Sequence, residues 1–300
     1  MENNKEKIKG MIYITSSFWS NTIWYILLGV LTVIQMVVIL RIDKNVKYIM
    51  VLFFVISGMT FTFEATILFF NAYDYYPLIM PKTPIYDTMA GNLFSQFSVT
   101  STALLIAVLN LKYYWFFVFS IIYGIIEELF IKFGLYKHHH WYKTWMTMLG
   151  LLILFGVTKY VYKNKYMFKK PILRYFFMLH GLFTLHMPTA WWIQMLSGIL
   201  TLNTKILPYP MSSFVLICVS NLFLISISCM FIYYSKLKWY WKSMIVLILY
   251  CVLYVAYKFA LIYVNIKGWF LIFASIDIGG MFLYIFILDK LFPPIKCDHV

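Results

Sequence analysis

The chain has 300 residues, of which 63% are hydrophobic and only 12% are charged, and its mean hydropathy is +0.80. Soluble domains contain about 25% charged residues, so the polar side chains are too few to cover a water-exposed surface, and a soluble fold is excluded. The net charge of +14 comes mostly from Lys and Arg in the short gaps between apolar runs. This distribution is typical of membrane topology and anionic headgroups and does not indicate nucleic-acid binding.

Nine apolar stretches have the length of a membrane-spanning helix, which needs about 20 mostly apolar residues. In chain order they lie at roughly 20–40, 48–70, 92–110, 113–132, 144–162, 172–197, 211–234, 242–264 and 268–289. The sixth stretch contains Pro188, so we expect it to kink or to end early. The segment before the first stretch has no small-residue cleavage site and is predicted to be retained. The pattern predicts an all-α polytopic membrane helix bundle with about nine transmembrane helices.

The loops predict the orientation of the chain. Loops that follow the odd-numbered stretches, together with the C-terminal tail, hold more of the 25 Lys and Arg residues than the loops of the other side. Cytoplasmic loops carry an excess of Lys and Arg. We therefore expect the C-terminus to be cytoplasmic and the N-terminus to lie outside.

The sequence repeats weakly along its length. Four pairs of segments match in the same order and at nearly one offset: Phe53–Gly58 with Phe176–Gly181, Asn92–Phe94 with Asn221–Phe223, Leu111–Trp115 with Leu237–Trp241, and Lys132–Phe133 with Lys258–Phe259. They predict a parallel duplication of a four-helix unit, preceded by one extra helix. The predicted boundaries are 1–47 for the N-terminal segment and extra helix, 48–165 and 166–291 for the repeats, and 292–300 for the tail.

Ionisable side chains inside the apolar stretches are the first candidates for a functional site, because a charge in the hydrocarbon is costly. A rise of about 1.5 Å per residue places four of them in one layer in the outer half of the membrane, with Asp277 nearer the midplane. The predicted binding residues are Glu64, Glu127, His186, Lys258 and Asp277. They would bind a proton, another cation or a small polar solute. The alternative is that they form structural pairs that only set the register of the helices.

The tract His138-His139-His140 is a weak candidate for metal binding. Two neighbouring histidines in a loop can ligate one ion, but no complete ligand set is evident, so a polar cluster at the membrane interface is the alternative. The four cysteines contain no Cys-x-x-Cys pair, and no nucleotide-binding or zinc-peptidase motif occurs, so no cofactor is predicted.

The segment from Ile125 to Trp141, with Glu127-Glu128 before Lys-Phe-Gly-Leu-Tyr-Lys and the histidines, resembles the signature of a family of small multi-pass membrane proteins from spore-forming Gram-positive bacteria. The resemblance covers the first repeat, residues 48–165. The second repeat has Leu253 and Tyr254 in place of the two glutamates. The resemblance implies a protein of a bacterial cytoplasmic membrane and implies no particular activity.

A second resemblance concerns the glutamate-type intramembrane proteases that cleave prenylated substrates. Glu127-Glu128-Leu-Phe-Ile-Lys132 and Phe176-Phe177-Met-Leu-His180 are similar to two of their motifs. The similarity implies a hydrolase in which Glu127, Glu128 and His180 activate water. The chain departs from the pattern because Lys132 replaces an arginine, and because Ala190, four residues after His186, replaces an Asn or Asp.

Three classes of function remain open. We favour a non-enzymatic carrier, or a sensor-like partner protein, that uses a polar site in the outer half of the bilayer and contacts lipid and a small polar solute or ion. The first alternative is the intramembrane hydrolase. The second is a structural or assembly protein, in which the intramembrane charges would be replaceable in pairs by apolar residues.

Overall fold

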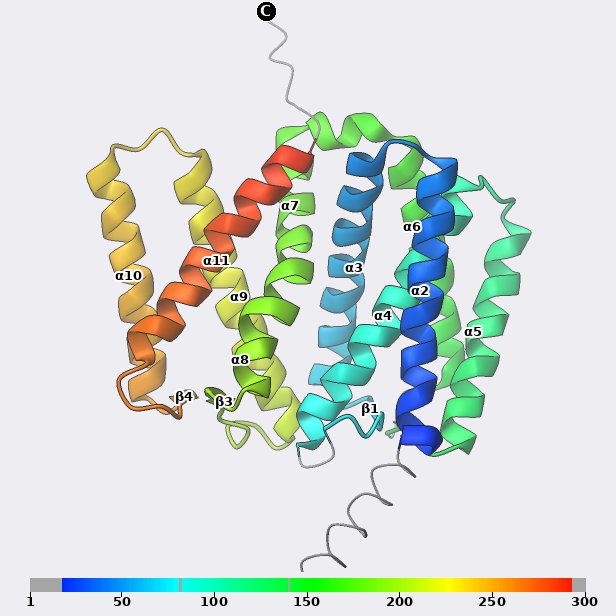
Figure 1. Cartoon of the computed structure of the whole chain (residues 1–300), viewed down its shortest axis with the longest axis horizontal. Coiled ribbons are helices and arrows are strands. Elements are labelled where there is room, and N and C mark those ends of the chain that lie inside the picture. Colours follow the sequence, from blue (N-terminus) through cyan, green and yellow to red (C-terminus); the bar gives the residue numbers. More distant parts are fainter. Residues whose placement is uncertain (1–17, 81–82, 140, 293–300) are drawn as a thin grey trace, which may run out of the picture. The chain divides into compact units, whose positions relative to one another are not determined.

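The computed structural model describes residues 18–80, 83–139 and 141–292, and the chain in these ranges is mostly helical (Figure 1). Eight helices in these ranges are long and apolar enough to cross a membrane, which is the architecture of a multi-pass membrane protein. The predicted all-α membrane helix bundle is thereby confirmed, with eight such helices in the described ranges where about nine were predicted. The predictions for the segment before Phe18, for His140 and for the tail from Pro293 lie outside the described residues.

The helices divide into two compact units. The first comprises the described residues up to Lys44 together with Ala72–Lys163, and the second comprises Asn45–Asn71 and the described residues from Asn164 onward. Helix α3 (Val46–Phe69) belongs to the second unit, although its neighbours in the sequence belong to the first. The units therefore divide the chain differently from the predicted repeats, because helix packing rather than sequence order decides which helices cluster.

The first unit contains four helices that pack around an apolar core. They are α2 (Ile23–Ile42, after the π turn η1, Phe18–Thr22), α4 (Pro84–Val108), α5 (Tyr114–Lys132) and α6 (Thr144–Lys163). Helix α2 packs along α4, and α6 packs against both α4 and α5. Buried Ala103, Phe116 and Phe155 lie at the centre of the core that joins α4, α5 and α6.

Helix α4 begins at Pro84, earlier than the predicted residue 92. Proline is tolerated in the first turn of a helix, where its missing N–H would have no intrahelical partner. Asp87 in the same turn accepts hydrogen bonds from the backbone amides of Leu78 (3.0 Å) and Met80 (2.8 Å). The proline-rich loop is therefore bound to the start of the helix that it precedes.

A short antiparallel ribbon completes the first unit. Strands β1 (Tyr73–Tyr75) and β2 (Tyr136–His138) pair with Tyr73 opposite His138. Helix α5 ends at a left-handed Gly134 (φ +70°), and the Leu135 amide donates to the Phe130 carbonyl at 2.8 Å, which closes the helix end. A Cβ atom on Gly91 of α4 would lie 2.5 Å from the Cβ of Tyr75, so the ribbon packs closely over that helix.

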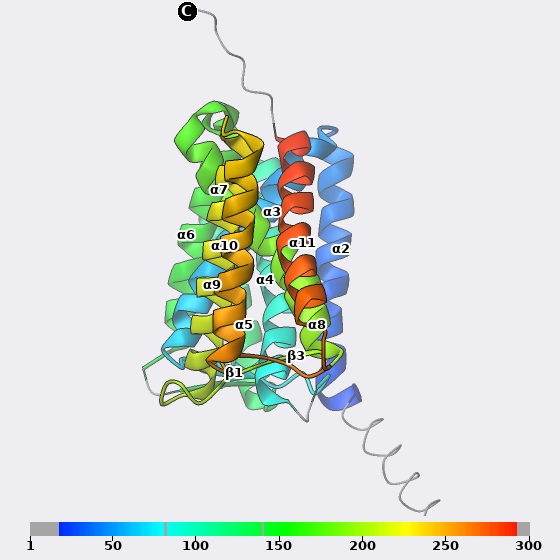
Figure 2. The same ribbon diagram turned by 90° about the vertical axis from the view of Figure 1, so that its left-hand side faces the viewer.

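The second unit contains more helical segments. They are α3, the 3₁₀ segment η2 (Lys165–Lys169), α7 (Pro171–His186), the π segment η3 (Met187–Trp192), α8 (Ile193–Leu196), α9 (Pro210–Tyr234), α10 (Trp239–Lys258) and α11 (Phe270–Leu291). Strands β3 (Leu200–Leu202) and β4 (Ile262–Val264) form an antiparallel ribbon. Figures 1 and 2 show α9 and α10 as an antiparallel hairpin, with α3 alongside α7.

Helices α3 and α7 approach each other very closely. A Cβ atom built on Gly58 of α3 would lie 1.8 Å from the backbone carbonyl oxygen of His180 in α7. The hydroxyl of Thr184 donates a hydrogen bond to the carbonyl oxygen of Phe54 at 2.7 Å. A glycine at position 58 is therefore necessary for this helix contact.

The predicted sixth span is interrupted at Pro188, as expected. Helical structure continues from Pro171 to Leu196, but its longest regular segment, α7, has 16 residues, fewer than the roughly 20 that cross the hydrocarbon core. Proline clashes with the carbonyl group of the residue four positions earlier and cannot donate to it. The helix widens into the π segment η3 at this point, and π segments are frequent at functional sites.

Candidate functional site

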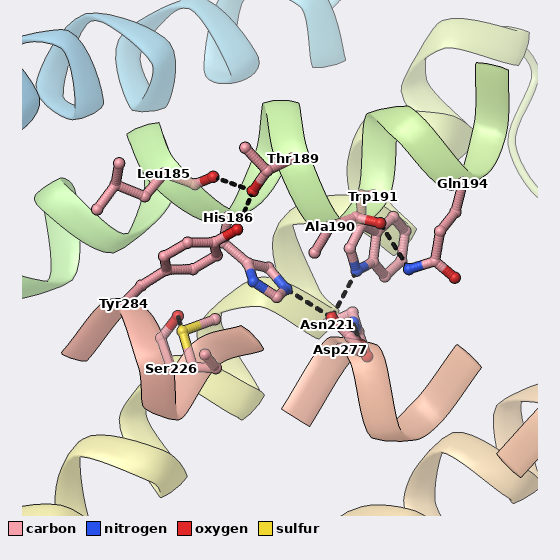
Figure 3. Close-up of polar contacts among 11 residues, drawn as sticks. Leu185, His186, Thr189, Ala190, Trp191, Gln194, Asn221, Ser226, Asp277 and Tyr284 are labelled. Atoms are coloured by element: carbon pink, nitrogen blue, oxygen red, sulfur yellow. Dashed lines mark hydrogen bonds and ion pairs between the residues drawn. The ribbon is translucent and has the colours of Figure 1, made fainter. Parts of the chain in front are cut away.

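The second unit buries a carboxylate in the middle of a membrane-spanning helix. Asp277 lies in α11 and is 0% exposed. Three side chains donate hydrogen bonds to it (Figure 3): His186 Nε2 to Oδ1 at 2.5 Å, Trp191 Nε1 to Oδ1 at 2.8 Å, and Asn221 Nδ2 to Oδ2 at 3.1 Å. We call these four residues the Asp277 cluster.

The interrupted helix and α9 position these donors. His186 is the last residue of α7, and Trp191 lies in the π segment η3. The wider π turn brings both side chains onto Asp277, as Figure 3 shows. Asn221 comes from α9, so α7, α9 and α11 all contribute to the cluster.

Some buried polar atoms at this site have no hydrogen-bond partner among the described residues. His186 donates through Nε2, and its other ring nitrogen, Nδ1, is buried without a partner. The side-chain oxygen of Gln194 is also buried without a partner, while its amide nitrogen donates to the Ala190 carbonyl at 2.5 Å. Both atoms are acceptors, and a buried acceptor without a donor is costly. Trp192 Nε1 is a buried donor that likewise has no hydrogen-bond partner among the described residues.

The Asp277 cluster carries a net negative charge when Asp277 is ionised and His186 is neutral. Histidine, tryptophan and asparagine then solvate Asp277 as neutral donors, and the carboxylate keeps its negative charge. A net charge inside the hydrocarbon region of the membrane is energetically costly. One proton on His186 Nδ1, or one small cation, would make the cluster neutral overall.

The other predicted binding residues of the second unit lie elsewhere on its helices. Glu64 is buried in α3, with 6% of its surface exposed. Lys258 is the exposed last residue of α10, with its ammonium group 5.4 Å from the centre of the Tyr254 ring. Of the five predicted binding residues, His186 and Asp277 are in direct contact.

In the first unit, two histidines bind two different carboxylates. His138 Nε2 lies 2.6 Å from Glu127, and His139 Nε2 lies 2.8 Å from Asp74. Among the described residues, no group of three His, Cys, Asp or Glu side chains is arranged to hold a metal ion. Burial, followed by the negative charge of Asp74, raises the pKa of the nearby Tyr76 hydroxyl.

The residues of the predicted hydrolase are divided between the two units. Glu127 is paired with His138, and Glu128 accepts a hydrogen bond from the hydroxyl of Thr144. His180 belongs to the second unit, where its Nδ1 contacts the Phe176 carbonyl oxygen at 2.8 Å. Each side chain therefore has a local partner within its own unit.

Sequence reasoning missed a second buried polar network, in the first unit. Gln35 of α2 donates to Thr102 at 2.8 Å and accepts from Ser101 at 2.5 Å, both in α4. The Tyr123 hydroxyl of α5 contacts Thr102 at 2.8 Å and Ser98 at 2.9 Å. None of these side chains is charged, so a search for charges passes over them. The run Ser-Val-Thr-Ser-Thr at 98–102 inside an apolar helix is the signal that identifies them.

A third polar group joins the ends of three helices in the second unit. Arg174 of α7 pairs with Asp289 of α11 at 2.8 Å, and the Tyr234 hydroxyl of α9 donates to the same carboxylate oxygen at 2.8 Å. Asp289 is 28% exposed at its side chain, so this group lies closer to the surface than the Asp277 cluster. It ties α7, α9 and α11 together at one end.

In comparisons with known proteins, no family model, curated protein or solved structure matches the chain. The two resemblances drawn from the sequence therefore stay predictions.

Proposed function

We propose that this protein is a carrier or a sensor of the membrane, and that the Asp277 cluster is its binding site for a proton or another small cation. The observation that carries the proposal is a completely buried carboxylate that is hydrogen-bonded by an imidazole, an indole and an amide, with no Lys or Arg among them, while the second nitrogen of the imidazole has no partner among the described residues. A proton is the cation that a packed cluster accommodates without additional space. Intramembrane Asp and His residues are the groups that relay protons in membrane proteins.

Proton binding is tested directly by infrared difference spectroscopy of the reconstituted protein between acidic and alkaline pH. We expect a pH-dependent carboxyl or imidazole signal that is lost in Asp277→Asn and changed in His186→Gln. Glu128→Gln is the matched control, since it removes an acid from a membrane helix outside the cluster. A signal that survives Asp277→Asn and disappears in Glu128→Gln would reject the proposed site and favour the hydrolase hypothesis.

Carrier and sensor are separated by a flux measurement. Proteoliposomes with a pH-sensitive dye inside report proton movement under an imposed membrane potential. A carrier gives a flux that Asp277→Asn abolishes and Glu128→Gln preserves. A sensor gives no flux, and its tryptophan fluorescence or cysteine accessibility instead changes with pH in a manner that depends on Asp277.

We also propose that the chain contains a duplicated unit, as the sequence predicts. The order helix, strand, helix, helix, strand, helix occurs as α3, β1, α4, α5, β2, α6 and again as α7, β3, α9, α10, β4, α11, if α7, η3 and α8 are taken as one interrupted helix. The helices that precede the second strand of each ribbon, α5 and α10, both end at a left-handed residue, Gly134 and Ala260. These shared features support a common origin of the two halves.

The orientation and location remain part of the proposal. We place the protein in a bacterial cytoplasmic membrane with a cytoplasmic C-terminus, on the basis of the lysine distribution and the resemblance of residues 125–141. A fluorescent protein fused to the C-terminus, of a type that folds only in the cytoplasm, should then fluoresce. A dark but stably produced fusion would reverse the assignment.

A further inference from the structure

The second unit carries a cluster of exposed lysines at one end, which we call the basic rim. Its members are Lys47, Lys165, Lys169, Lys170, Lys236 and Lys238. They come from the start of α3, from η2 and the residue after it, and from the turn between α9 and α10. No Asp or Glu occurs in the sequence between Glu128 and Asp277, so the segments from η2 through α10 contain no acidic residue.

Contacts within the unit show that these segments lie at the same end. The ammonium group of Lys165 lies 4.6 Å from the centre of the Tyr48 ring, which joins η2 to the start of α3. The rings of Tyr175 in α7 and Tyr234 in α9 are 5.3 Å apart, which places the start of α7 beside the end of α9. Figures 1 and 2 show the same arrangement of α7 and α9.

The segment η2 is anchored at this end by one buried side chain. Phe168 is 0% exposed, and its ring lies 5.8 Å from that of Tyr48 and 4.6 Å from that of Phe177. With Phe168 fixed inward, Lys165, Lys169 and Lys170 remain on the exposed side of the short helix. Their positive charges are therefore held close to the ends of the membrane helices.

Apolar and aromatic side chains accompany the lysines. Ile172 is 84% exposed in the first turn of α7, and Trp239 is 77% exposed at the start of α10. Exposed tryptophan and tyrosine next to lysine are typical of the level of lipid headgroups. Among the described residues of the second unit, the one acid at this end is Asp289, which is already paired with Arg174 and hydrogen-bonded by Tyr234.

We propose that the basic rim is a binding surface for the headgroups of anionic phospholipids in the leaflet that it faces. The ligand is the lipid phosphodiester with its net negative charge, held by several lysines at once, while Ile172 and Trp239 contact the acyl-chain boundary. Clusters of basic residues next to membrane helices attract anionic lipid over a distance of about a Debye length. The inference is independent of the Asp277 cluster and of the direction in which the chain crosses the membrane.

The test is lipid selectivity, measured by electron paramagnetic resonance on the full-length protein in phosphatidylcholine vesicles. Spin-labelled phosphatidylglycerol and phosphatidylcholine report the relative association of anionic and neutral lipid with the protein surface. The variant is Lys169→Gln with Lys236→Gln. The matched control is Lys205→Gln with Lys267→Gln, which removes the same charge from exposed lysines of the loops that precede α9 and α11.

For the wild type we expect phosphatidylglycerol to be preferred by about fivefold or more, with a several-fold loss in the rim variant and little change in the control. The preference should weaken as salt is raised. An equal loss in both double variants would mean that net charge alone sets the selectivity, and would overturn the proposal. Stronger displacement by inorganic phosphate than by chloride at equal ionic strength would also overturn it, in favour of a free-phosphate site. If the double variant does not fold, the single variants Lys169→Gln and Lys236→Gln are compared with the single controls Lys205→Gln and Lys267→Gln in the same way.

Discussion

The polar side chains that join helices in the first unit are neutral amides and hydroxyls, whereas in the second unit they surround a buried carboxylate. Gln35, Ser101 and Thr102 can exchange donors and acceptors among themselves, and the Ser101 hydroxyl can donate instead to the Ser98 carbonyl oxygen, which lies 3.0 Å away. Asp277 has no such freedom, since a carboxylate only accepts and its three donors depend on it. Neutral amides and hydroxyls do not titrate near neutral pH, whereas a carboxylate and an imidazole are both groups that can bind a proton.

The largest expected effect comes from removing the centre of each network. Asp277→Ala should lower the free energy of unfolding by about 3–5 kcal/mol, because it leaves three buried donors unpaired. Gln35→Ala should cost about 1–2 kcal/mol, since the hydroxyls around it retain other acceptors. Reversible unfolding in mixed detergent micelles measures both. Equal losses of unfolding free energy in the two variants would mean that buried Asp277 contributes no more to stability than the neutral amide of Gln35.

A second prediction compares the close approaches in the two units. Gly58→Ala should destabilise the second unit by about 3 kcal/mol, because the new methyl group meets a backbone carbonyl that cannot move independently. Gly29→Ala in the first unit should cost less, about 1 kcal/mol, because its new methyl group would lie 3.0 Å from the ring of Phe94, a half-buried side chain that can shift. Gly156→Ala in α6 is the control, with no atom within 4 Å of the new methyl group, and should be neutral or slightly stabilising. A harmless Gly58→Ala would contradict the packing of α3 on α7.

The hydroxyl of Tyr123 tests how much one member of the neutral network contributes. Tyr123→Phe removes its contacts with Ser98 and Thr102, and should lower the free energy of unfolding by about 1 kcal/mol. Tyr240→Phe, on a side chain that is 45% exposed, should change it by less than about 0.5 kcal/mol. A Tyr123→Phe effect as small as that of the control would show that the network adds little to helix association.

The smallest effect is expected where α10 ends. Ala260 has a φ of +55°, a left-handed conformation that glycine adopts without strain and that Gly134 already adopts after α5. Ala260→Gly should therefore raise the free energy of unfolding by about 0.5–1 kcal/mol. Ala256→Gly, within α10, should lower it by about 1 kcal/mol. A loss of stability in both variants would argue against the left-handed conformation at position 260.

Much of the architecture follows from single properties of the sequence. Long apolar stretches predicted the membrane helices, because a helix that spans hydrocarbon must be apolar over its whole length. Pro188 predicted the interruption of the sixth stretch through its ring and missing N–H. The predicted start of the third stretch at residue 92 was too late, because Pro84 begins α4 and the first turn of a helix tolerates proline.

The candidate functional site, too, was predicted only in part from the sequence. Charge placed His186 and Asp277 among five candidates, since an ionisable group in an apolar helix is conspicuous in any sequence, but the depth estimate assigned the two residues to different levels of the membrane. The tertiary structure decided that these two side chains touch, that Trp191 and Asn221 complete the cluster, and that Glu127 is paired with His138 instead. It also decided that α3 packs with α7. Such contacts depend on helix rotation and on close approaches such as that at Gly58, which arise only when several helices pack at once, whereas hydrophobicity acts on each helix separately.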